Sequence, residues 1–245
     1  MEWTDEGIVL SARRHGERSA VVSLLTSQHG RHAGFARGVT AGSGRGLYLP
    51  GNRVHARWRA RLDQHLGHYS CELLRADAAA LLEDPGRLAC LSAACAMVEA
   101  SLPERQPHTA VHAGLSALLD ALTSGTAEWE SLYVRWEVGL LGALGYGLDL
   151  GECAVTGRND GLVYVSPRTG RAVSASAGEP YHDRLLPLPR FLTSGGRATP
   201  ADIAAGLRLT GHFLTTHVTP VLPPARARLA SRFEPVTRSS HRDAG

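Results

Sequence analysis

Lysine is absent from the sequence, and all 26 of its lysine or arginine positions hold arginine. A chain without lysine has neither a phosphate-binding loop of the G-x-x-x-x-G-K type nor a lysine that forms Schiff bases. The sequence also lacks an apolar run of about 18 residues, the length that crosses a membrane. Its N-terminus, MEWTDEGIVL, is acidic where a signal peptide is basic. We therefore expect a soluble, cytoplasmic protein.

Cysteine is scarce, and its spacing matches no disulfide framework, so we expect reduced, mostly buried thiols. The four positions are Cys71, Cys90, Cys95 and Cys153. The segment that starts at Cys153 has the length of a zinc ribbon, in which two Cys-x-x-Cys pairs lie roughly 15 to 20 residues apart. The other three ligand positions hold Thr156, Ser174 and Ala177, none of them a useful zinc ligand. The sequence predicts a ribbon-like segment that binds no zinc.

Motifs for catalysis are missing as well. No G-x-S-x-G sequence is present, and His212 and His217 lie five residues apart, on different faces of a helix. The glycine-rich stretch at 42–46 is typical of a flexible connection between strands, and His15, His29 and His32 fall in or beside expected turns. We expect a protein that is not an enzyme and needs no cofactor.

Charge is distributed unevenly along the chain. Residues 1–75 hold 11 arginines and 6 acidic residues (+5), residues 76–150 hold 3 and 10 (−7), and residues 151–245 hold 12 and 7 (+5). A basic end joined to an acidic middle indicates that one face of the protein meets a polyanion.

The first 75 residues show the period-2 pattern of strands. Five strand-like runs, at 7–14, 20–26, 30–38, 53–62 and 66–74, alternate with turns. In the fourth run the apolar residues occupy the even positions from Val54 to Leu62, whereas the odd positions from Arg53 to Arg61 are arginine or histidine. Five short strands in this length predict an OB-fold β-barrel.

The basic row of the fourth run has two interpretations. It is either the ordinary solvent face of a half-exposed strand or, together with Arg45 in the neighbouring loop, a surface for phosphates. Phe35, His55 and Trp58 are candidates for stacking on bases, although the even position of Trp58 favours a place in the barrel core.

From residue 84 the apolar period changes to 3.6. Asp84 and Pro85 predict the start of a helix, further helices are expected near 111–122 and 132–144, and Thr199, Pro200 and Asp202 start another. Two strand-like pieces between 153 and 180 predict a β-hairpin insertion, held by apolar contacts from Val155, Leu162, Tyr164 and Val173. The expected fold class is α+β. An OB-fold domain (1–78) precedes a helical domain (79–233) with a degenerate zinc-ribbon-like hairpin at about 150–180, and a disordered tail (234–245) follows.

Several blocks of sequence, in order, resemble the RecO family of bacterial recombination mediators. They are GIVLSARRHGERSAVVSLLTSQHGRHAGFARG, PGNRVHARWRARL, YVRWEVGLLGALGYGLDLGECAVTG and YVSPRTGRAV. The resemblance implies an OB-fold, a helical domain and a ribbon with variable cysteines. It also implies binding of single- and double-stranded DNA near the nucleoid, and annealing of strands coated with single-strand-binding protein, whose acidic, apolar C-terminal tail it contacts. RecR is the implied partner in loading RecA during recombinational repair, with SOS-linked DNA damage as the setting.

The resemblance and the charge pattern together select candidate DNA contacts. The family pattern implies Arg31, Arg37 and Arg57, and the basic row and loop add Arg45, Arg53, Arg59 and Arg61. Arg226, Arg228 and Arg232 either contact DNA or a protein tail or form a solvated helix face. Two alternatives stay open: an OB-fold module that binds RNA, and a scaffold that binds only acidic proteins.

Overall fold

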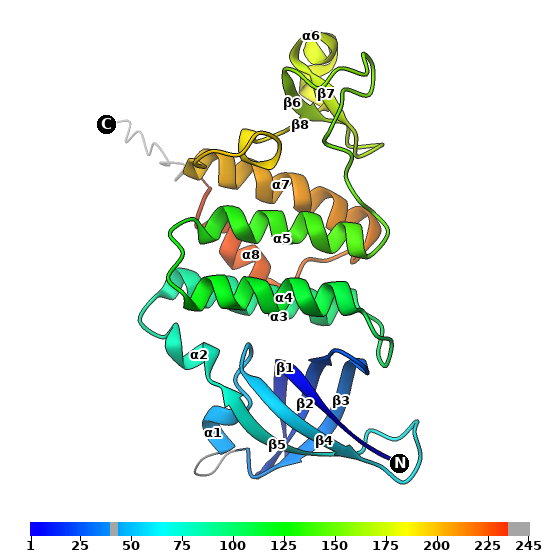
Figure 1. The fold of residues 1–245 in the computed structure, drawn as a ribbon, viewed down its shortest axis with the longest axis vertical. Helices are drawn as coiled ribbons and strands as arrows, with labels where there is room; N and C mark the ends of the chain where they lie inside the picture. The colour runs from blue at the N-terminus through cyan, green and yellow to red at the C-terminus, as the bar shows by residue number, and fades with distance from the viewer. Residues whose placement is uncertain (40–43, 235–245) are drawn as a thin grey trace, which may run out of the picture.

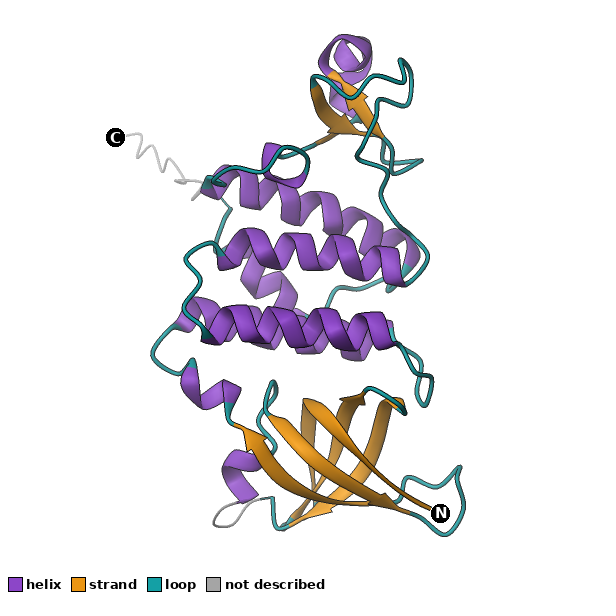
Figure 2. Ribbon diagram, viewed as in Figure 1, coloured by secondary structure: helices purple, strands orange, loops and turns teal. Residues whose placement is uncertain are grey.

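The computed structural model describes residues 1–39 and 44–234, without the side chain of Arg45. Three parts are stacked along the long axis of the molecule (Figure 1). A β-barrel forms one end, layers of helices form the middle, and a small sheet forms the other end (Figure 2). The tail predicted to be disordered lies outside the described residues except for Glu234.

The five predicted strands form a closed barrel in the order β1-β2-β3-β5-β4, which confirms the expected OB-fold. The strands are β1 (Glu2–His15), β2 (Ser19–Thr26), β3 (Gly30–Arg37), β4 (Arg53–Arg59) and β5 (His68–Arg75). A short helix, α1 (Gly44–Leu47), lies in the connection between β3 and β4. The first strand begins five residues earlier than its sequence pattern indicates, because Glu2–Gly7 pairs with β4.

Alternation along β4 sends the side chains of Val54, Ala56 and Trp58 into the barrel, where all three are fully buried. Trp58 donates a hydrogen bond from Nε1 to the carbonyl oxygen of Leu66 at 2.9 Å. Trp58 therefore belongs to the core. The predicted inward position of Leu62 is wrong: β4 ends at Arg59, and Leu62 is exposed.

The helical layers in the middle of the molecule consist of α2 (Asp77–Ala80), α3 (Pro85–Ser101), α4 (Thr109–Thr123), α5 (Trp129–Ala143), α7 (Pro200–His217) and α8 (Pro224–Ser231). The predicted start signals are confirmed. The Asp84 side chain accepts hydrogen bonds from the backbone N–H groups of Gly86 and Arg87, and Thr199 and Asp202 form a capping box.

The barrel and the helices share a hydrophobic contact. Alternation along β1 turns Val9 toward the barrel core and Ile8 and Leu10 toward the core of the helical part, and a β-bulge between Val9 and Ser11 then brings Ala12 to the inner side. Leu25 of β2 joins the same helical core. The barrel is thereby fixed against α3 by apolar side chains on its outer surface.

The predicted hairpin is present as β6 (Leu162–Val165) and β7 (Ala172–Ser174), and a third strand, β8 (Leu186–Pro187), pairs with β6. Helix α6 (Ala175–Gly178) and two 3₁₀ turns, η1 (Glu179–Arg184) and η2 (Arg190–Leu192), complete this end. Leu162 and Val173 are buried as expected, but Val155 is 71% exposed and cannot support the hairpin. Among the described residues, no helix is both long and apolar enough to cross a membrane.

Candidate nucleic-acid interface

The basic row of β4 lies on the outer surface of the barrel, as its odd positions predict. The side chains of Arg57 and Arg59 are 60% and 78% exposed. Arg61 follows the end of β4 and is exposed too. These three arginines are accessible to a ligand.

The strands beside β4 bring carboxylates to the same outer surface. Register places Glu2 opposite Arg59, Glu6 opposite His55, and His55 opposite Glu72. Glu2 forms an ion pair with Arg57 and lies 3.9 Å from Arg59. The hydrogen bond from Arg57 lowers the pKa of the Glu2 carboxyl group. The face that looked uniformly cationic along β4 is therefore mixed in charge, and His55 lies between two acids.

Arg31 and Arg53 hold the barrel against the helices. Arg31 donates to the carbonyl oxygen of Leu102 at 2.8 Å and pairs with Glu104 at 3.2 Å. Arg53 pairs with Asp77 at 3.1 Å and Asp120 at 2.8 Å, and donates to the hydroxyl of Ser116. Because both guanidinium groups are already hydrogen-bonded inside this junction, they belong to the contact between barrel and helices and not to the candidate interface.

A second outer surface carries arginine, histidine and aromatic side chains. We call it the platform: His15 of β1, Phe35 and Arg37 of β3, and His68 of β5. The Phe35 ring lies 5.1 Å from the His15 ring and 5.9 Å from the His68 ring, centroid to centroid. Register brings these residues together, since Phe35 pairs with His68 and Arg37 with Ser19, which in turn pairs with His15. No ion pair in the described part of the chain involves the platform's arginine or histidines.

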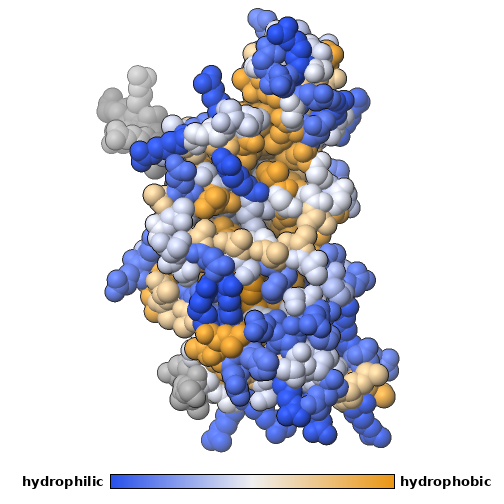
Figure 3. Space-filling model, viewed as in Figure 1, coloured by the Kyte–Doolittle hydropathy of each residue, from blue (hydrophilic) through white to orange (hydrophobic). Residues whose placement is uncertain are grey.

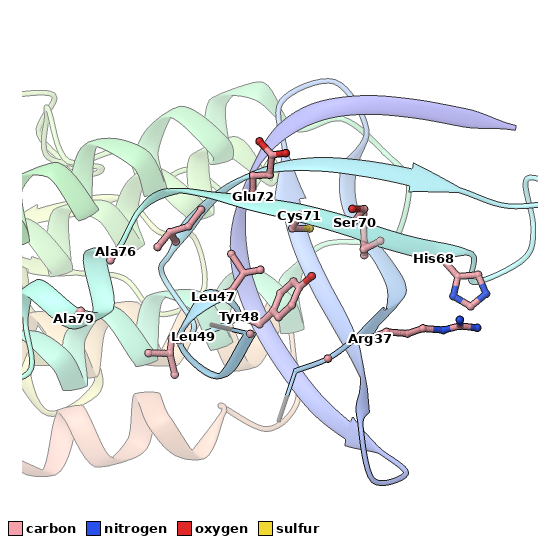
Figure 4. Close-up of a pocket in the computed structure, with 15 residues that line it drawn as sticks. Arg37, Leu47, Tyr48, Leu49, His68, Ser70, Cys71, Glu72, Ala76 and Ala79 are labelled. Atoms are coloured by element: carbon pink, nitrogen blue, oxygen red, sulfur yellow. The ribbon is translucent and has the colours of Figure 1, made fainter. Parts of the chain in front are cut away.

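A cavity of about 1070 Å³ adjoins the platform. It lies between β5 and α1, with Arg37 and His68 at one end and Ala76 and Ala79 at the other (Figure 4). It opens because β5 pairs with β3 at only two positions. Arg45 belongs to α1, but its side chain lies outside the described residues. The platform and the exposed part of the basic row adjoin across this region, because His68 pairs with Arg59 on its other side.

The C-terminal arginines differ from one another. Arg226 is 3% exposed and forms a bidentate ion pair with Glu137, at 3.0 and 2.9 Å. The prediction that it contacts DNA or a protein tail is wrong, because neither ligand reaches it. Arg228 and Arg232 are exposed at the end of α8, and their role stays a prediction.

The four ribbon positions do not fit zinc. Cys153 is fully buried, and the backbone N–H of Ser174 donates to its Sγ at 3.3 Å, with the Ser174 hydroxyl 3.5 Å away. One thiol, two hydroxyls and a methyl group supply one good zinc ligand where four are needed. Hydrogen bonds around the thiol join the loop that carries Cys153 to the end of β7.

The sequence pattern located one half of this interface. Arg37 and Phe35 were candidates, and they alternate with inward residues along β3. His15 and His68 were missed, because no local signal shows that a turn residue of β1 and the first residue of β5 flank the same ring. The only available hint was the alternation of Arg31, Ala33, Phe35 and Arg37 on one face of the third strand.

Comparison with known proteins covers the whole chain. The family descriptions "Recombination protein O N terminal" and "Recombination protein O C terminal" match residues 1–76 and 82–224. A protein of Rhodospirillum centenum named DNA repair protein RecO is 55% identical over 251 residues, which cover 100% of this chain and 98% of the relative. Proteins of the same name from Rhodospirillum rubrum and Phenylobacterium zucineum are 50% and 49% identical, over 97% of this chain and 96% and 100% of their own lengths.

Proposed function

The chain belongs to the RecO family of DNA repair proteins, and on this premise we propose that it binds single- and double-stranded DNA through its barrel and anneals complementary strands. With RecR, it helps to load RecA onto DNA coated by single-strand-binding protein during recombinational repair. The observation that carries the proposal is the platform, where an aromatic ring accessible to bases lies among one arginine and two histidines that form no ion pair within the described part of the chain.

The platform and the exposed arginines contact different parts of the DNA. Guanidinium groups contact phosphates without reading sequence, and the strength of these contacts falls steeply with salt. Aromatic rings stack on bases of any identity, which holds a single strand with its bases accessible. Annealing needs no catalytic residue on this scheme, because base pairing drives the reaction once two strands are held close and their repulsion is screened.

Salt titration of DNA affinity tests the cationic part. We expect replacement of Arg37, Arg59 and Arg61 by glutamine to reduce the slope of log K against log salt by about 2, since each lost phosphate contact removes about 0.7 for a single strand. The matched control replaces Arg168, Arg184 and Arg190, which are exposed near the small sheet at the opposite end of the molecule. An equal loss of slope in both triple variants would refute a barrel-centred interface.

Replacement of Phe35 by alanine tests the stacking part. Loss of one base–aromatic stack lowers affinity for a single strand by about 1–3 kcal/mol, while the salt slope stays unchanged because no charge is removed. Competition between DNA and RNA of the same sequence separates the proposal from an RNA-binding module. Absence of any DNA binding at low salt would instead favour a scaffold for acidic proteins.

A groove between α4 and α5 fits the acidic, apolar tail of single-strand-binding protein. The cavity measures about 350 Å³, and its lining is almost entirely apolar, with Leu118, Trp136 and Leu140 among its residues. Gly114 and Gly139 leave it open, and Arg135 supplies its one charged side chain. Arg135 donates to the carbonyl oxygen of Phe191 and pairs with no carboxylate among the described residues, so its charge remains available to an acidic chain end. Figure 3 shows hydrophobic residues gathered over the helical layers on the face that carries α4 and α5.

Charge reversal at Arg135 tests this groove. We expect Arg135→Glu to abolish binding of a fluorescent peptide that carries the tail sequence, while Arg208→Glu, an exposed change on α7, leaves it intact. Strand annealing on DNA coated with single-strand-binding protein, with and without its last residues, then shows whether the contact matters for function. Equal annealing in both cases would contradict the proposed role of the tail.

A further inference from the structure

A third cavity lies where the outer surface of β1, β2 and β3 meets the helical part. It has a volume of about 440 Å³, within the range of ~300–1,000 Å³ that is usual for small-ligand sites. The barrel side of the cavity includes Val21, Ser23 and Ala33. The helical side includes Ala96 and Ala100 of α3 and the Pro223–Pro224 pair. Two walls of small or flat apolar groups therefore face each other.

Two ion pairs frame this cavity, and within each pair the positive and negative charges cancel. Arg13 pairs with Glu99 at 3.2 Å, and Arg31 pairs with Glu104 at 3.2 Å. Ser11 also donates to Glu99 at 2.7 Å. A phosphate placed here would meet two carboxylates, and an ammonium or guanidinium group would meet two guanidinium groups. The cavity therefore suits a neutral ligand that has hydrogen-bonding edges.

Ser23 is a buried polar residue in the wall of the cavity. This residue is 5% exposed, it lines the cavity, and its hydroxyl makes no hydrogen bond within the described part of the chain. A buried hydroxyl without a partner is costly, and such groups in folded proteins need an explanation. Because Ser23 lines the cavity, a ligand there could supply that partner.

The cavity lies beside the platform. Ala33 and Phe35 are alternate residues of β3 on one face of the strand, about 6.6 Å apart along it. Val21 pairs with Phe35, and Ser23 pairs with Ala33, so the floor of the cavity continues the floor of the platform. A strand with one base stacked on Phe35 thus has its next base at the mouth of the cavity.

We propose that this cavity takes a single unpaired nucleobase from the strand bound on the platform. The inference rests on the proposed DNA binding and adds a subsite with a base preference. The apolar walls cover the two faces of the base, and the Ser23 hydroxyl and the carboxylates of Glu99 and Glu104 meet its edge. Carboxylates accept hydrogen bonds, so guanine, which presents adjacent N1–H and N2–H donors, fits better than thymine, whose single N–H lies between two carbonyl oxygens.

Binding of short oligonucleotides tests the subsite directly. Fluorescence anisotropy compares a thymine-only 12-mer with one that carries a single central guanine. We expect the guanine oligonucleotide to bind about fivefold more tightly, the gain of about one net hydrogen bond to a charged or buried partner. Inosine in place of guanine lacks the N2 amino group and should lose part of that gain.

Two variants separate the subsite from the platform. Ala100→Trp fills the cavity from an exposed position of α3 and should remove the guanine preference while it leaves thymine affinity and the salt slope intact. Ala113→Trp, an exposed change on α4 outside the cavity, is the matched control. Ser23→Ala should weaken the preference and raise the melting temperature of the free protein, because it removes the unpaired hydroxyl.

The outcomes distinguish the two proposals. Equal affinity for both oligonucleotides in the unchanged protein, or a guanine preference that survives Ala100→Trp, overturns the subsite while DNA binding stands. Weaker binding of both oligonucleotides by Phe35→Ala, with the ratio of the two affinities unchanged, supports both. Failure of the unchanged protein to bind any oligonucleotide at low salt overturns both proposals together.

Discussion

The buried pair of Arg226 and Glu137 predicts a large effect on stability from a change of one arginine. Arg226 donates to both carboxylate oxygens of Glu137 and also to the carbonyl oxygen of Leu207 at 2.6 Å. Tyr133 donates to the same carboxylate at 2.9 Å, and Thr210 donates to its second oxygen. Both charged side chains are almost completely shielded from water. The pair joins α8 to α5, and the Leu207 and Thr210 contacts extend it to α7.

Arg226→Met keeps much of the apolar stem and removes the charge, so Glu137 is left as a buried carboxylate without a cation. Breaking a buried ion pair from one side costs about 3–5 kcal/mol. For a chain of this size, each kilocalorie lowers the melting temperature by about 2–4 °C, which gives a decrease of about 6–20 °C. The matched control is Arg228→Met, two residues along the same helix and exposed, for which we expect a change within about 0.5 kcal/mol.

Thermal and urea unfolding of four proteins measure this prediction: the unchanged chain, Arg226→Met, Glu137→Gln and the double variant. Glu137→Gln removes the negative charge, so the double variant should be more stable than Arg226→Met alone. This positive coupling is the signature of a paired charge. The pair does not stabilise the fold as argued if the melting temperatures of Arg226→Met and Arg228→Met differ by less than about 2 °C, which corresponds to less than about 1 kcal/mol of stability. The same holds if the effects of Arg226→Met and Glu137→Gln simply add in the double variant.

Three further predictions concern the barrel and the ribbon. Glu2→Gln should tighten DNA binding and steepen its salt slope, because it releases Arg57 and Arg59; an effect equal to that of Glu83→Gln, an exposed change outside the barrel, would show that Glu2 does not restrain them. Burial lowers the pKa of His32 from 6.5 to about 4. As the pH decreases, the unfolded chain therefore takes up this proton before the folded protein does. The free energy of unfolding should fall between pH 6.5 and pH 4, by up to about 3 kcal/mol. Urea unfolding at pH 7 and pH 4.5 should show a smaller loss for His32→Gln than for the unchanged protein, and equal losses contradict the assignment. The purified protein should contain far less than one zinc per chain by atomic emission, and a chelator should not change its melting temperature; a chelator-dependent decrease would show that the ribbon binds metal after all.

The positions of the exposed arginines were only partly predictable from the sequence. Alternation along β4 correctly placed Arg57 and Arg59 on the outer surface, because burial parity is a property of one strand. The same alternation placed Arg53 outside as well, yet Arg53 bonds Asp77 and Asp120 of the helical part. Parity tells which side of a strand a residue occupies, but it does not tell what packs against that side.

The difference in burial between Arg226 and Arg228 of α8 was likewise not predictable from the sequence. Both arginines belong to a polar-looking octapeptide with little amphipathic character in its sequence, so solvated and ligand-binding interpretations were equally compatible with it. Packing of α8 against α3, α5 and α7 buries the first and exposes the second. A buried arginine is recognisable only once its carboxylate partner is in place, and Glu137 lies 89 residues away along the chain.

The sequence alone determined the barrel, the four long helices with the caps at Asp84 and Thr199, the hairpin of β6 and β7, and the family, because these depend on periodicity, turn chemistry and motifs within short stretches. Only the tertiary structure decided which arginines face water without a carboxylate beside them. Ion pairing depends on distances across strands and between helices, and the acids that neutralise or anchor Arg31, Arg53, Arg57 and Arg226 all come from distant segments. The same folding step assembled the platform, by bringing His15 and His68 to the two sides of Phe35.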